Sequence, residues 1–194
     1  MTAADRSNRR RVRAYLGMSL DGCIAGPEDE LDWLGSSRPR ATGVPRTEDD
    51  FTTYDDFIRD VGVILMGRRT FDTVAGFDEW PYGQMPIVVA TSRVVDDAPG
   101  TVSTASGPPQ QLLEHALARA DDGDVYVDGG QLVSYVLEAG LLDELTTTIV
   151  PTVRGPGIGL FQALGRPVDL ELTRVATNQA GLVQLTWELS VETD

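Results

Sequence analysis

The chain has 194 residues, of which 41% are hydrophobic and 24% are charged, and this composition is typical of a globular domain with a sizeable core. Its net charge of −14 argues against a general nucleic-acid binder and against a protein that binds anionic membranes. A single cysteine, Cys23, and a single histidine, His115, exclude an internal disulfide, a cysteine-based zinc site and a multi-histidine metal centre. We therefore predict no bound metal.

The N-terminus is polar and lacks the apolar segment of a secretion signal, and no apolar run in the chain reaches the length of a membrane span. We expect residues 1–11 to form a flexible tail and residues 12–191 to form a single domain. These features favour a cytoplasmic protein.

The first predicted strand, Val12–Met18, leads into a sharp turn that contains Asp21 and Gly22. Asp21 has two interpretations: its carboxylate stabilises the turn with Gly22, or it takes part in catalysis. Cys23 lies beside apolar residues and is expected to fill a small packing volume.

Residues 28–53 are acidic and irregular, and long loops of this kind in compact domains are often functional. Asp32 and Trp33 lie there in a short apolar patch. Apolar side chains at helical spacing over Asp50–Arg59 predict an amphipathic helix with Tyr54 on its apolar face.

The chain is organised around an apolar run, Val61–Met66, that is followed by Gly67, Arg68, Arg69 and Thr70. A continuous apolar run predicts a strand buried on both faces, as in parallel sheets. A helix that begins after the glycine exposes unpaired N–H groups and the positive end of its dipole, and the guanidinium and hydroxyl groups add donors for an anion. These residues either bind a phosphate or form a solvated helix start.

Two more predicted strands, Pro86–Ala90 and Asp124–Val127, end in polar turns. The turn residues are Ser92 and Arg93 after the first strand, and Asp128, Gly129, Gly130 and Gln131 after the second. Strand–loop–helix units in series predict a largely parallel sheet, with ligands beyond the carboxyl ends of its strands. The polar turns should therefore line one edge of the sheet and hold one long polyanionic ligand at several points.

Two helices accompany these strands in the prediction. One covers Pro108–Ala120 and places His115 opposite its apolar face, so that this side chain is expected to be exposed. The other covers Leu132–Ala139 and ends at Gly140.

The C-terminal third favours strands over Glu144–Val150, Leu170–Thr177 and Leu182–Val191, with a structural turn at residues 155–159. In the last strand, Val183, Leu185, Trp187 and Leu189 alternate with Gln184, Thr186, Glu188 and Ser190. This alternation predicts an antiparallel hairpin at the sheet edge, with the apolar set buried and the polar set facing water. The predicted fold is thus a three-layer α/β domain with a mixed sheet.

The combined motifs resemble those of dihydrofolate-reductase-like proteins. Within them, the chain is most similar to the reductase domain of the bifunctional riboflavin-biosynthesis deaminase–reductase and its stand-alone relatives. The motifs that carry the resemblance are Met18–Ala25, Leu65–Thr70, Thr91–Arg93, Asp128–Gly130, Gly140–Leu145 and Pro151–Phe161. The resemblance runs from about Val12 to Glu188, and no deaminase zinc motif is present.

The resemblance implies NADPH as cofactor and a mixed sheet of about eight strands with helices on both faces. It implies that Gly67, Arg68, Arg69 and Thr70 hold the cofactor's phosphates, and that Ser92 and Arg93 bind the 2′-phosphate of the adenosine ribose. It also implies that Asp128, Gly129, Gly130 and Gln131 lie at the pyrophosphate. Along the nicotinamide it places Leu16, Gly17, Ile24 and Ala25.

The substrate side matches the family less clearly. Hydride transfer to a C=N or C=O carbon needs close positioning and a proton donor for the acceptor atom. The candidate carboxylates are Asp21, Asp32 and Asp55. Trp33 would cover a flat heterocycle or act as a hydrophobic plug, and Tyr54 would face the substrate or belong to the core.

We therefore expect an NADPH-dependent reductase of a pterin-like or pyrimidine-like heterocycle. One version reduces the phosphorylated ribosylamino-uracil of riboflavin synthesis, which needs basic residues for the substrate phosphate. The other reduces dihydrofolate or another unphosphorylated heterocycle, which needs a carboxylate. The alternatives are a sensor that binds NADPH without turnover and a purely structural module. A homodimer is expected by resemblance, and no nucleic-acid or membrane partner is expected.

Overall fold

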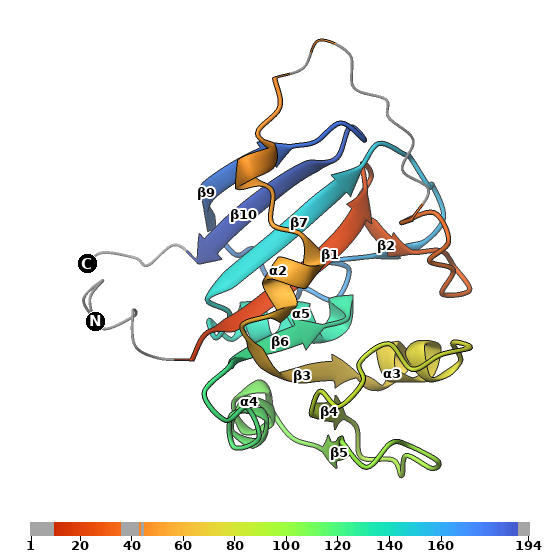
Figure 1. Ribbon diagram of the computed structural model, residues 1–194. Coiled ribbons are helices and arrows are strands. Elements are labelled where there is room, and N and C mark those ends of the chain that lie inside the picture. The colour runs from red at the N-terminus through yellow and green to blue at the C-terminus, as the bar shows by residue number, and fades with distance from the viewer. Residues whose placement is uncertain (1–9, 36–42, 44, 190–194) are drawn as a thin grey trace, which may run out of the picture.

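The computed structural model describes residues 10–35, 43 and 45–189 (Figure 1). Its strands are β1 (Val12–Ser19), β2 (Cys23–Ala25), β3 (Val61–Gly67), β4 (Ile87–Ala90), β5 (Val102–Ala105), β6 (Asp124–Asp128), β7 (Glu144–Val150), β8 (Ile158–Gly159), β9 (Leu170–Thr177) and β10 (Val183–Leu189). Its helices are the 3-10 helix η1 (Glu48–Asp50) and the α-helices α2 (Tyr54–Ile58), α3 (Arg68–Ala75), α4 (Pro109–Leu117) and α5 (Gly130–Glu138). Among these helices, none is long and apolar enough to cross a membrane.

Within the described residues the main sheet has eight strands in the order β5-β4-β3-β6-β1-β7-β10-β9. All neighbouring pairs from β5 to β7 are parallel, whereas β10 runs antiparallel to both β7 and β9. This arrangement confirms the predicted mixed, mostly parallel sheet with a C-terminal antiparallel hairpin at its edge.

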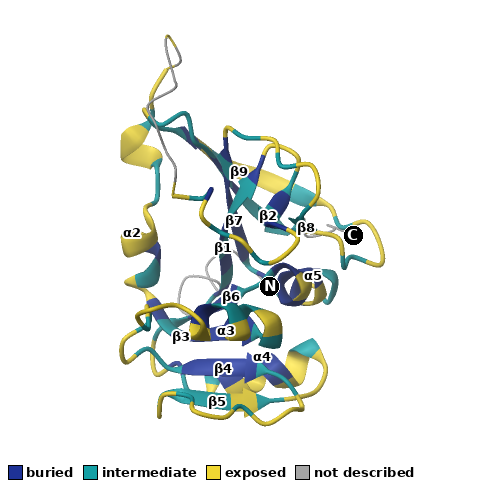
Figure 2. Ribbon diagram, turned by 90° about the vertical axis from the view of Figure 1, so that its right-hand side faces the viewer, coloured by how far each residue is buried: buried dark blue, intermediate teal, exposed yellow. Residues whose placement is uncertain are grey.

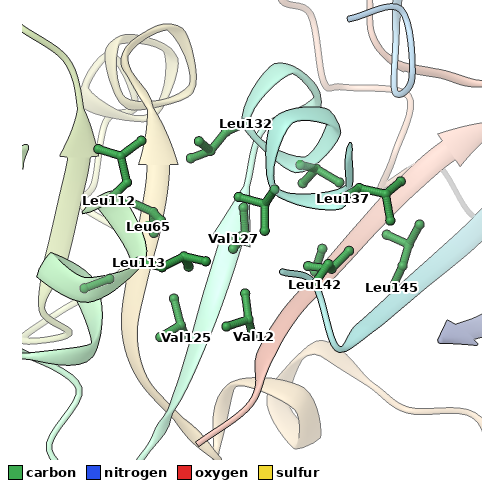
Figure 3. Close-up of a cluster of buried hydrophobic side chains, with 14 of the residues drawn as sticks. Val12, Leu65, Leu112, Leu113, Val125, Val127, Leu132, Leu137, Leu142 and Leu145 are labelled. Carbon is green, nitrogen blue, oxygen red and sulfur yellow. The ribbon is translucent and has the colours of Figure 1, made fainter. Parts of the chain in front are cut away.

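Alternate side chains of each central strand point to opposite sides of the sheet, and both sets are apolar. Helices therefore cover both faces. One face packs against α4 and α5, and Figure 3 shows Leu65, Val125 and Val127 of the sheet meeting Leu113 and Leu132 of these helices. The other face carries a second cluster that includes residues of α2 and α3. Figure 2 shows the resulting layers, with buried residues on the central strands and on the inner sides of α4 and α5.

Strand β5 was not predicted. It lies between β4 and α4, so the second of the repeated units is strand–strand–helix, although β4 and β5 are still parallel. Its sequence, Val102–Ala105, is short and half polar, and only one side of the strand is paired because it forms the sheet edge. A short polar edge strand gives little of the apolar signal on which strand prediction depends.

The predicted helix Asp50–Arg59 is wrong in extent. The structure has η1 and the short helix α2 instead, and Phe51 between them is extended, with φ −81° and ψ 112°. Thr53 begins α2 as its N-cap, because its side chain accepts a hydrogen bond from the backbone N–H of Asp56 at 3.1 Å. The break occurs because the Phe51–Thr53 segment bonds to the sheet.

The predicted wet face of β10 is also wrong. Gln184 and Thr186 are 1% and 3% exposed, while Val183, Leu185 and Trp187 are only partly buried. The polar face is covered because Gln184 bonds to the backbone of Thr52, which crosses this end of the sheet.

Residues 1–9 of the predicted tail lie outside the described residues. Arg10 and Arg11, which we also assigned to the tail, are held in place instead. The Arg10 guanidinium donates to the carbonyls of Leu117 and Asp121, and the Arg11 N–H donates to the Asp124 carboxylate at 2.7 Å. The exposure of His115 and the burial of Cys23 agree with expectation.

Candidate functional site

The three polar turns lie at one edge of the sheet, as the sequence predicted. Met66 of β3 pairs with Asp128 of β6, and Gly67 pairs with Ala90 of β4. The strand register therefore brings the turns after β3, β4 and β6 side by side at the carboxyl ends of parallel strands, where α/β sheets bind ligands (Figure 1).

Strands β1 and β6 diverge next to this edge. Their backbone pairing involves Val12 and Arg13 at the start of β1, whereas β1 pairs with β7 as far as Ser19. Figure 1 shows the two strands separating toward their carboxyl ends. Leu16 and Gly17, the predicted nicotinamide neighbours, lie on the part of β1 that is not paired with β6.

Two helices begin at this edge without a side-chain cap. The N-cap residues of α3 and α5 are Gly67 and Gly129, which have no side chain to cap the helix, and neither first turn contains an acidic residue. Their first N–H groups and positive dipole ends are therefore suited to an anion. A Cβ on Gly67 would meet nothing within 4 Å, so the backbone there is open to close approach.

Arg68 and Arg69, on the first turn of α3, both have protein partners. The Arg68 guanidinium donates to the Asp72 carboxylate at 2.7 Å and to the Val94 carbonyl at 2.8 Å, which ties α3 to the turn after β4. The Arg69 Nε donates to both oxygens of Asp29, at 2.7 and 3.0 Å, and so links α3 to the loop after β2. A phosphate at this helix start would share these guanidinium groups with carboxylates.

Ser92 and Arg93 are exposed in the turn after β4. The turn is held by a hydrogen bond from the Arg93 backbone N–H to the Thr91 hydroxyl at 3.0 Å. Among the described residues, the Arg93 guanidinium makes no hydrogen bond or ion pair. Its charge is therefore available to a ligand that reaches this turn.

Gly129 and Gly130 are needed for packing as well as for any ligand. Gly129 has φ +95°, and a Cβ there would lie 2.3 Å from the Thr70 hydroxyl. A Cβ on Gly130 would lie 2.9 Å from Ile24 Cδ1 and 3.0 Å from the Leu160 carbonyl oxygen. Because Gly129 and Gly130 have no side chains, the start of α5 can pack closely against Thr70, Ile24 and the Leu160 carbonyl.

The remaining predicted cofactor residues lie around this junction. Ile24 and Ala25 are on β2, which pairs with β8 in a separate two-stranded sheet. The turn predicted over residues 155–159 is therefore wrong for Ile158 and Gly159, which form β8. Thr70 lies against Gly129, whereas the Gln131 amide donates to the Tyr135 hydroxyl at 2.9 Å on the exposed side of α5.

Asp21 joins two loops. Its carboxylate accepts hydrogen bonds from the Ser19 hydroxyl at 2.6 Å and from the backbone N–H groups of Arg154 and Gly155 at 3.0 and 2.8 Å. These bonds, that of Ser19 above all, hold the pKa of Asp21 well below its ordinary value. Asp21 therefore stays ionised and fixes the loop after β1 to the loop after β7.

The other predicted substrate-side residues are spread over two regions. Asp32 and Asp55 are exposed, while Trp33 is buried, donates to the Glu30 carbonyl and lies under the Arg154 guanidinium. Tyr54 is 40% exposed at the start of α2, so it is not a core residue.

Asp128 is a carboxyl group whose pKa is changed by its burial in the folded protein. It follows Tyr126 by two residues on β6 and so faces the α2 side of the sheet. Burial, and after it the negative charge of Asp128, raises the pKa values of Tyr54 and Tyr82. Burial raises the pKa of Asp128 to about 6, against the smaller lowering effects of the Gly129 backbone and the Tyr126 side chain. We had assigned Asp128 to the cofactor, and only its position after an apolar strand marked it in the sequence.

Trp80 and Tyr82 were missed. They belong to the second apolar cluster, in which the Trp80 ring lies edge-on to Phe71 and to Tyr82, with centroids 6.1 and 5.6 Å apart. The Trp80 indole nitrogen is buried without a hydrogen-bond partner among the described residues. Their segment between α3 and β4 has no regular pattern from which these contacts could be read.

The described residues contain no group of three or more histidine, cysteine, aspartate or glutamate side chains that could hold a metal ion. The site is thus built from backbone N–H groups, arginines, phenols and carboxylates.

Known proteins support the same architecture. The model of the RibD C-terminal domain family matches residues 10–184. The uncharacterized protein YwjB of Bacillus subtilis is 26% identical over 165 residues, which cover 84% of this chain and 89% of YwjB. A putative riboflavin biosynthesis protein from Shewanella sp. PV-4 superposes with a TM-score of 0.76 at 27% identity, covering 93% of this chain and 99% of that one.

The fold extends to a more distant protein. Dihydrofolate reductase from Enterococcus faecalis, in complex with NADP(H) and RAB-propyl, superposes with a TM-score of 0.59 at 18% identity, covering 93% of this chain and 97% of that one. This similarity shows a dihydrofolate-reductase-like fold. Since the family model spans nearly all of the sheet, the chain belongs to the RibD C-terminal domain family.

Proposed function

We propose that this protein is an NADPH-dependent reductase that transfers a hydride to a pterin-like or pyrimidine-like heterocycle, with Asp128 as the carboxyl group on the substrate side. The observation that supports the proposal is the strand register, which brings the turns after β3, β4 and β6 together at one sheet edge, with Asp128 at the start of the third. Membership of a family that includes reductase domains supports this class of reaction.

The residues at this edge fit a phosphorylated dinucleotide. The uncapped N-termini of α3 and α5 suit its phosphates, and the open backbone at Gly67 allows close approach. Arg93, whose guanidinium has no partner in the described part of the chain, suits a further phosphate such as the 2′-phosphate that distinguishes NADPH from NADH. When bound, this cofactor supplies the hydride.

Asp128 is better suited to proton transfer than the carboxylates predicted from the sequence. With a pKa of about 6, it holds a proton in a useful fraction of molecules near neutral pH and can donate it to an acceptor atom. Asp21 accepts three hydrogen bonds and stays ionised, and Asp32 and Asp55 are exposed. We therefore assign the carboxyl role to Asp128, and the phenols of Tyr54 and Tyr82 to the surface around it.

The experiment is stopped-flow measurement of NADPH absorbance with a panel of dihydropterins, dihydrofolate and ribosylamino-uracils. We expect at least one heterocycle to oxidise NADPH, and Asp128→Asn to slow that step at least 100-fold while the NADPH dissociation constant changes less than threefold. Tight NADPH binding with no oxidation by any compound would favour a sensor. Absence of NADPH binding, together with no protection against heat, would refute the proposal.

We further propose a homodimer in the cytoplasm, with the β9 edge as the contact. β9 is the last strand of the sheet in the described residues; its outer edge bonds to Thr47 at Thr177, and Leu172 and Val175 on β9 are 47% and 48% exposed. Sedimentation analysis should give twice the 21.0 kDa chain mass, and Val175→Lys should shift the protein to the monomer. A wild-type monomer at micromolar concentration would refute this assignment.

A further inference from the structure

We infer that Asp29 is an anion that the protein itself supplies to Arg69 at the start of α3, and that a phosphate of the dinucleotide displaces it when it binds there. Asp29 is thus an intramolecular competitor, which lowers the affinity of this turn for phosphate groups. The inference rests on the proposed function and deepens it, because it concerns the regulation of the same anion-binding turn.

The contact between Asp29 and Arg69 joins two segments that are 40 positions apart in the sequence. Both carboxylate oxygens of Asp29 accept from the Arg69 Nε, at 2.7 and 3.0 Å. The first turn of α3 contains no acidic residue of its own, so Asp29 brings negative charge to a helix start where the dipole is positive. A carboxylate therefore already bonds to a guanidinium that we assign to the cofactor's phosphates.

A turn with several internal hydrogen bonds presents Asp29 to the helix. Asp29 has φ +68°, a left-handed conformation that is uncommon for residues other than glycine. Its N–H donates to the Gly26 carbonyl at 3.2 Å, and the Gly26 N–H donates to the Glu30 carbonyl at 3.0 Å. The Glu30 carboxylate accepts from the Glu28 N–H at 2.8 Å. These bonds hold the turn, so the contact with Arg69 is more than a chance meeting of two mobile side chains.

The loop that carries Asp29 also reaches β1. Trp33 is buried, and its indole N–H donates to the Glu30 carbonyl at 3.1 Å. The next residue, Leu34, packs on Gly17, where an added Cβ would lie 2.8 Å from Leu34 Cδ2. The loop therefore runs between two residues that we assign to the cofactor, one on α3 and one on β1, which places Asp29 within the site.

Arg69 is better placed to change its partner than Arg68. The Arg68 side chain is 23% exposed and bonds to Asp72 of its own helix and to the Val94 carbonyl, so that it ties α3 to the neighbouring turn. The Arg69 side chain is 62% exposed, and its Nη groups make no hydrogen bond to the described residues. Exposed ion pairs are weak, and a phosphate offers more charge and more acceptor oxygens than a carboxylate. A phosphate can therefore bond to the Nη groups and then replace Asp29.

The test measures NADPH binding by fluorescence titration in wild type, Asp29→Asn, Arg69→Gln and the double variant. Asparagine is tolerated in the left-handed conformation, so Asp29→Asn removes the charge and keeps the turn. We expect Asp29→Asn to lower the NADPH dissociation constant about three- to fivefold, because Arg69 becomes free for the phosphate. In the Arg69→Gln background, the same substitution should change this constant by less than about 1.5-fold, because no guanidinium remains to compete for.

Glu28→Gln is the matched control. Glu28 is exposed in the same turn and does not bond to Arg69, so this variant removes the same charge without freeing the guanidinium. It should change the NADPH dissociation constant by less than about 1.5-fold. Equal gains from Glu28→Gln and Asp29→Asn would reduce the effect to net charge and would overturn the inference.

Unchanged or weaker NADPH binding by Asp29→Asn would overturn it as well, and weaker binding with faster dissociation would mean that the ion pair holds the bound cofactor in place. These results leave the reductase proposal standing, since NADPH still binds. If NADPH binds to none of the proteins, the proposed function falls. Calorimetry with inorganic pyrophosphate then decides the inference: tighter binding by Asp29→Asn than by wild type supports it, and no gain overturns it.

Discussion

The side-chain amide of Gln184, on β10, exchanges two hydrogen bonds of 2.9 Å with the backbone of Thr52, donating to its carbonyl and accepting from its N–H. The Tyr15 hydroxyl donates to the same carbonyl at 2.9 Å. The Gln184 side chain therefore bonds the backbone as a neighbouring strand would, and it holds the segment before α2 against the sheet. Because the Thr53 cap of α2 follows directly, this pair of bonds also fixes where α2 begins, and with it Tyr54.

Replacing Gln184 by Met should destabilise the protein. Methionine has a similar size but no amide. It would leave the Thr52 N–H without its acceptor and the Thr148 hydroxyl without the amide N–H that it accepts at 3.1 Å. We expect a loss of about 2 kcal/mol in the free energy of unfolding, and a fall in Tm of about 4–8 °C in a chain of this size. Thermal unfolding followed by circular dichroism measures both.

The matched control is Gln110→Met on the exposed face of α4, which should change Tm by less than about 1 °C. The Gln184 variant should also weaken heterocycle binding more than NADPH binding, because α2 lies on the substrate side. An unchanged Tm would mean that the Thr52 segment is held by Tyr15 and by packing alone.

Much of the fold could be predicted because its central strands are apolar throughout. Val61–Gly67 is buried along most of its length, and a run of this kind between turn residues has few other interpretations. The polar turns could be placed on one edge for the same reason, since the carboxyl ends of parallel strands coincide. The resemblance of Gly67–Thr70 and Asp128–Gly130 to one family then predicted which ligand these turns bind.

The substrate side could not be predicted because its geometry depends on contacts between distant residues. The polarity of Gln184 indicated a position that faces water, whereas its bonds to Thr52, 132 positions away, and to Thr148 allow its burial. The raised pKa of Asp128 likewise depends on its burial in the folded protein. Local patterns report neither relationship.

Replacing Arg93 by Ala should separate the two nicotinamide cofactors. If its unpartnered guanidinium binds the 2′-phosphate, the loss of a charged hydrogen bond costs about 1.5–3 kcal/mol, which raises the NADPH dissociation constant about 10- to 150-fold. NADH binding should change less than threefold. Fluorescence titration with both cofactors is the measurement, and Arg166→Ala, far along the chain beside Glu138, is the control. Equal losses for NADPH and NADH would place Arg93 away from the 2′-phosphate.

Asp128 should make stability depend on pH in an unusual direction for a carboxyl group. Burial raises its pKa from 3.8 to about 6, so the native protein keeps a proton that the unfolded chain has released between these values. Stability from this group is therefore present below about pH 4 and is lost as the pH rises through about 6. Asn cannot ionise, so the free energy of unfolding of Asp128→Asn relative to wild type should rise by up to about 3 kcal/mol between pH 4 and pH 7.

Urea unfolding at several pH values measures this difference, and Asp122→Asn provides the exposed control. Comparison with wild type at each pH removes the opposite contribution of Asp21, whose pKa is lowered. A difference between Asp128→Asn and wild type that stays constant from pH 4 to pH 7 would show that Asp128 ionises as freely in the native protein as in the unfolded chain.

The junction of β6, α3 and α5 should tolerate no side chain at Gly129. Both Gly129 and Gly140 have positive φ, +95° and +71°, so alanine is strained at either position. At Gly140 a Cβ meets nothing within 4 Å, whereas at Gly129 it would lie 2.3 Å from the Thr70 hydroxyl. Gly140→Ala should therefore cost about 1 kcal/mol of stability, and Gly129→Ala about 2–4 kcal/mol, because strain and collision add.

The double variant Gly129→Ala with Thr70→Gly separates these two effects. Removing the hydroxyl relieves the collision but leaves the backbone strain, so the cost of alanine at position 129 should fall to about that at Gly140 in this background, as a double-mutant cycle of unfolding free energies would show. If the cost does not fall, the collision with Thr70 is not its source, because the next nearest backbone atom, the Gly67 N, lies at an ordinary contact distance of 3.9 Å from the added Cβ. The contact between Gly129 and Thr70 also sets the distance between the N-termini of α5 and α3. We therefore expect the affinity for NADPH to fall together with stability in both backgrounds.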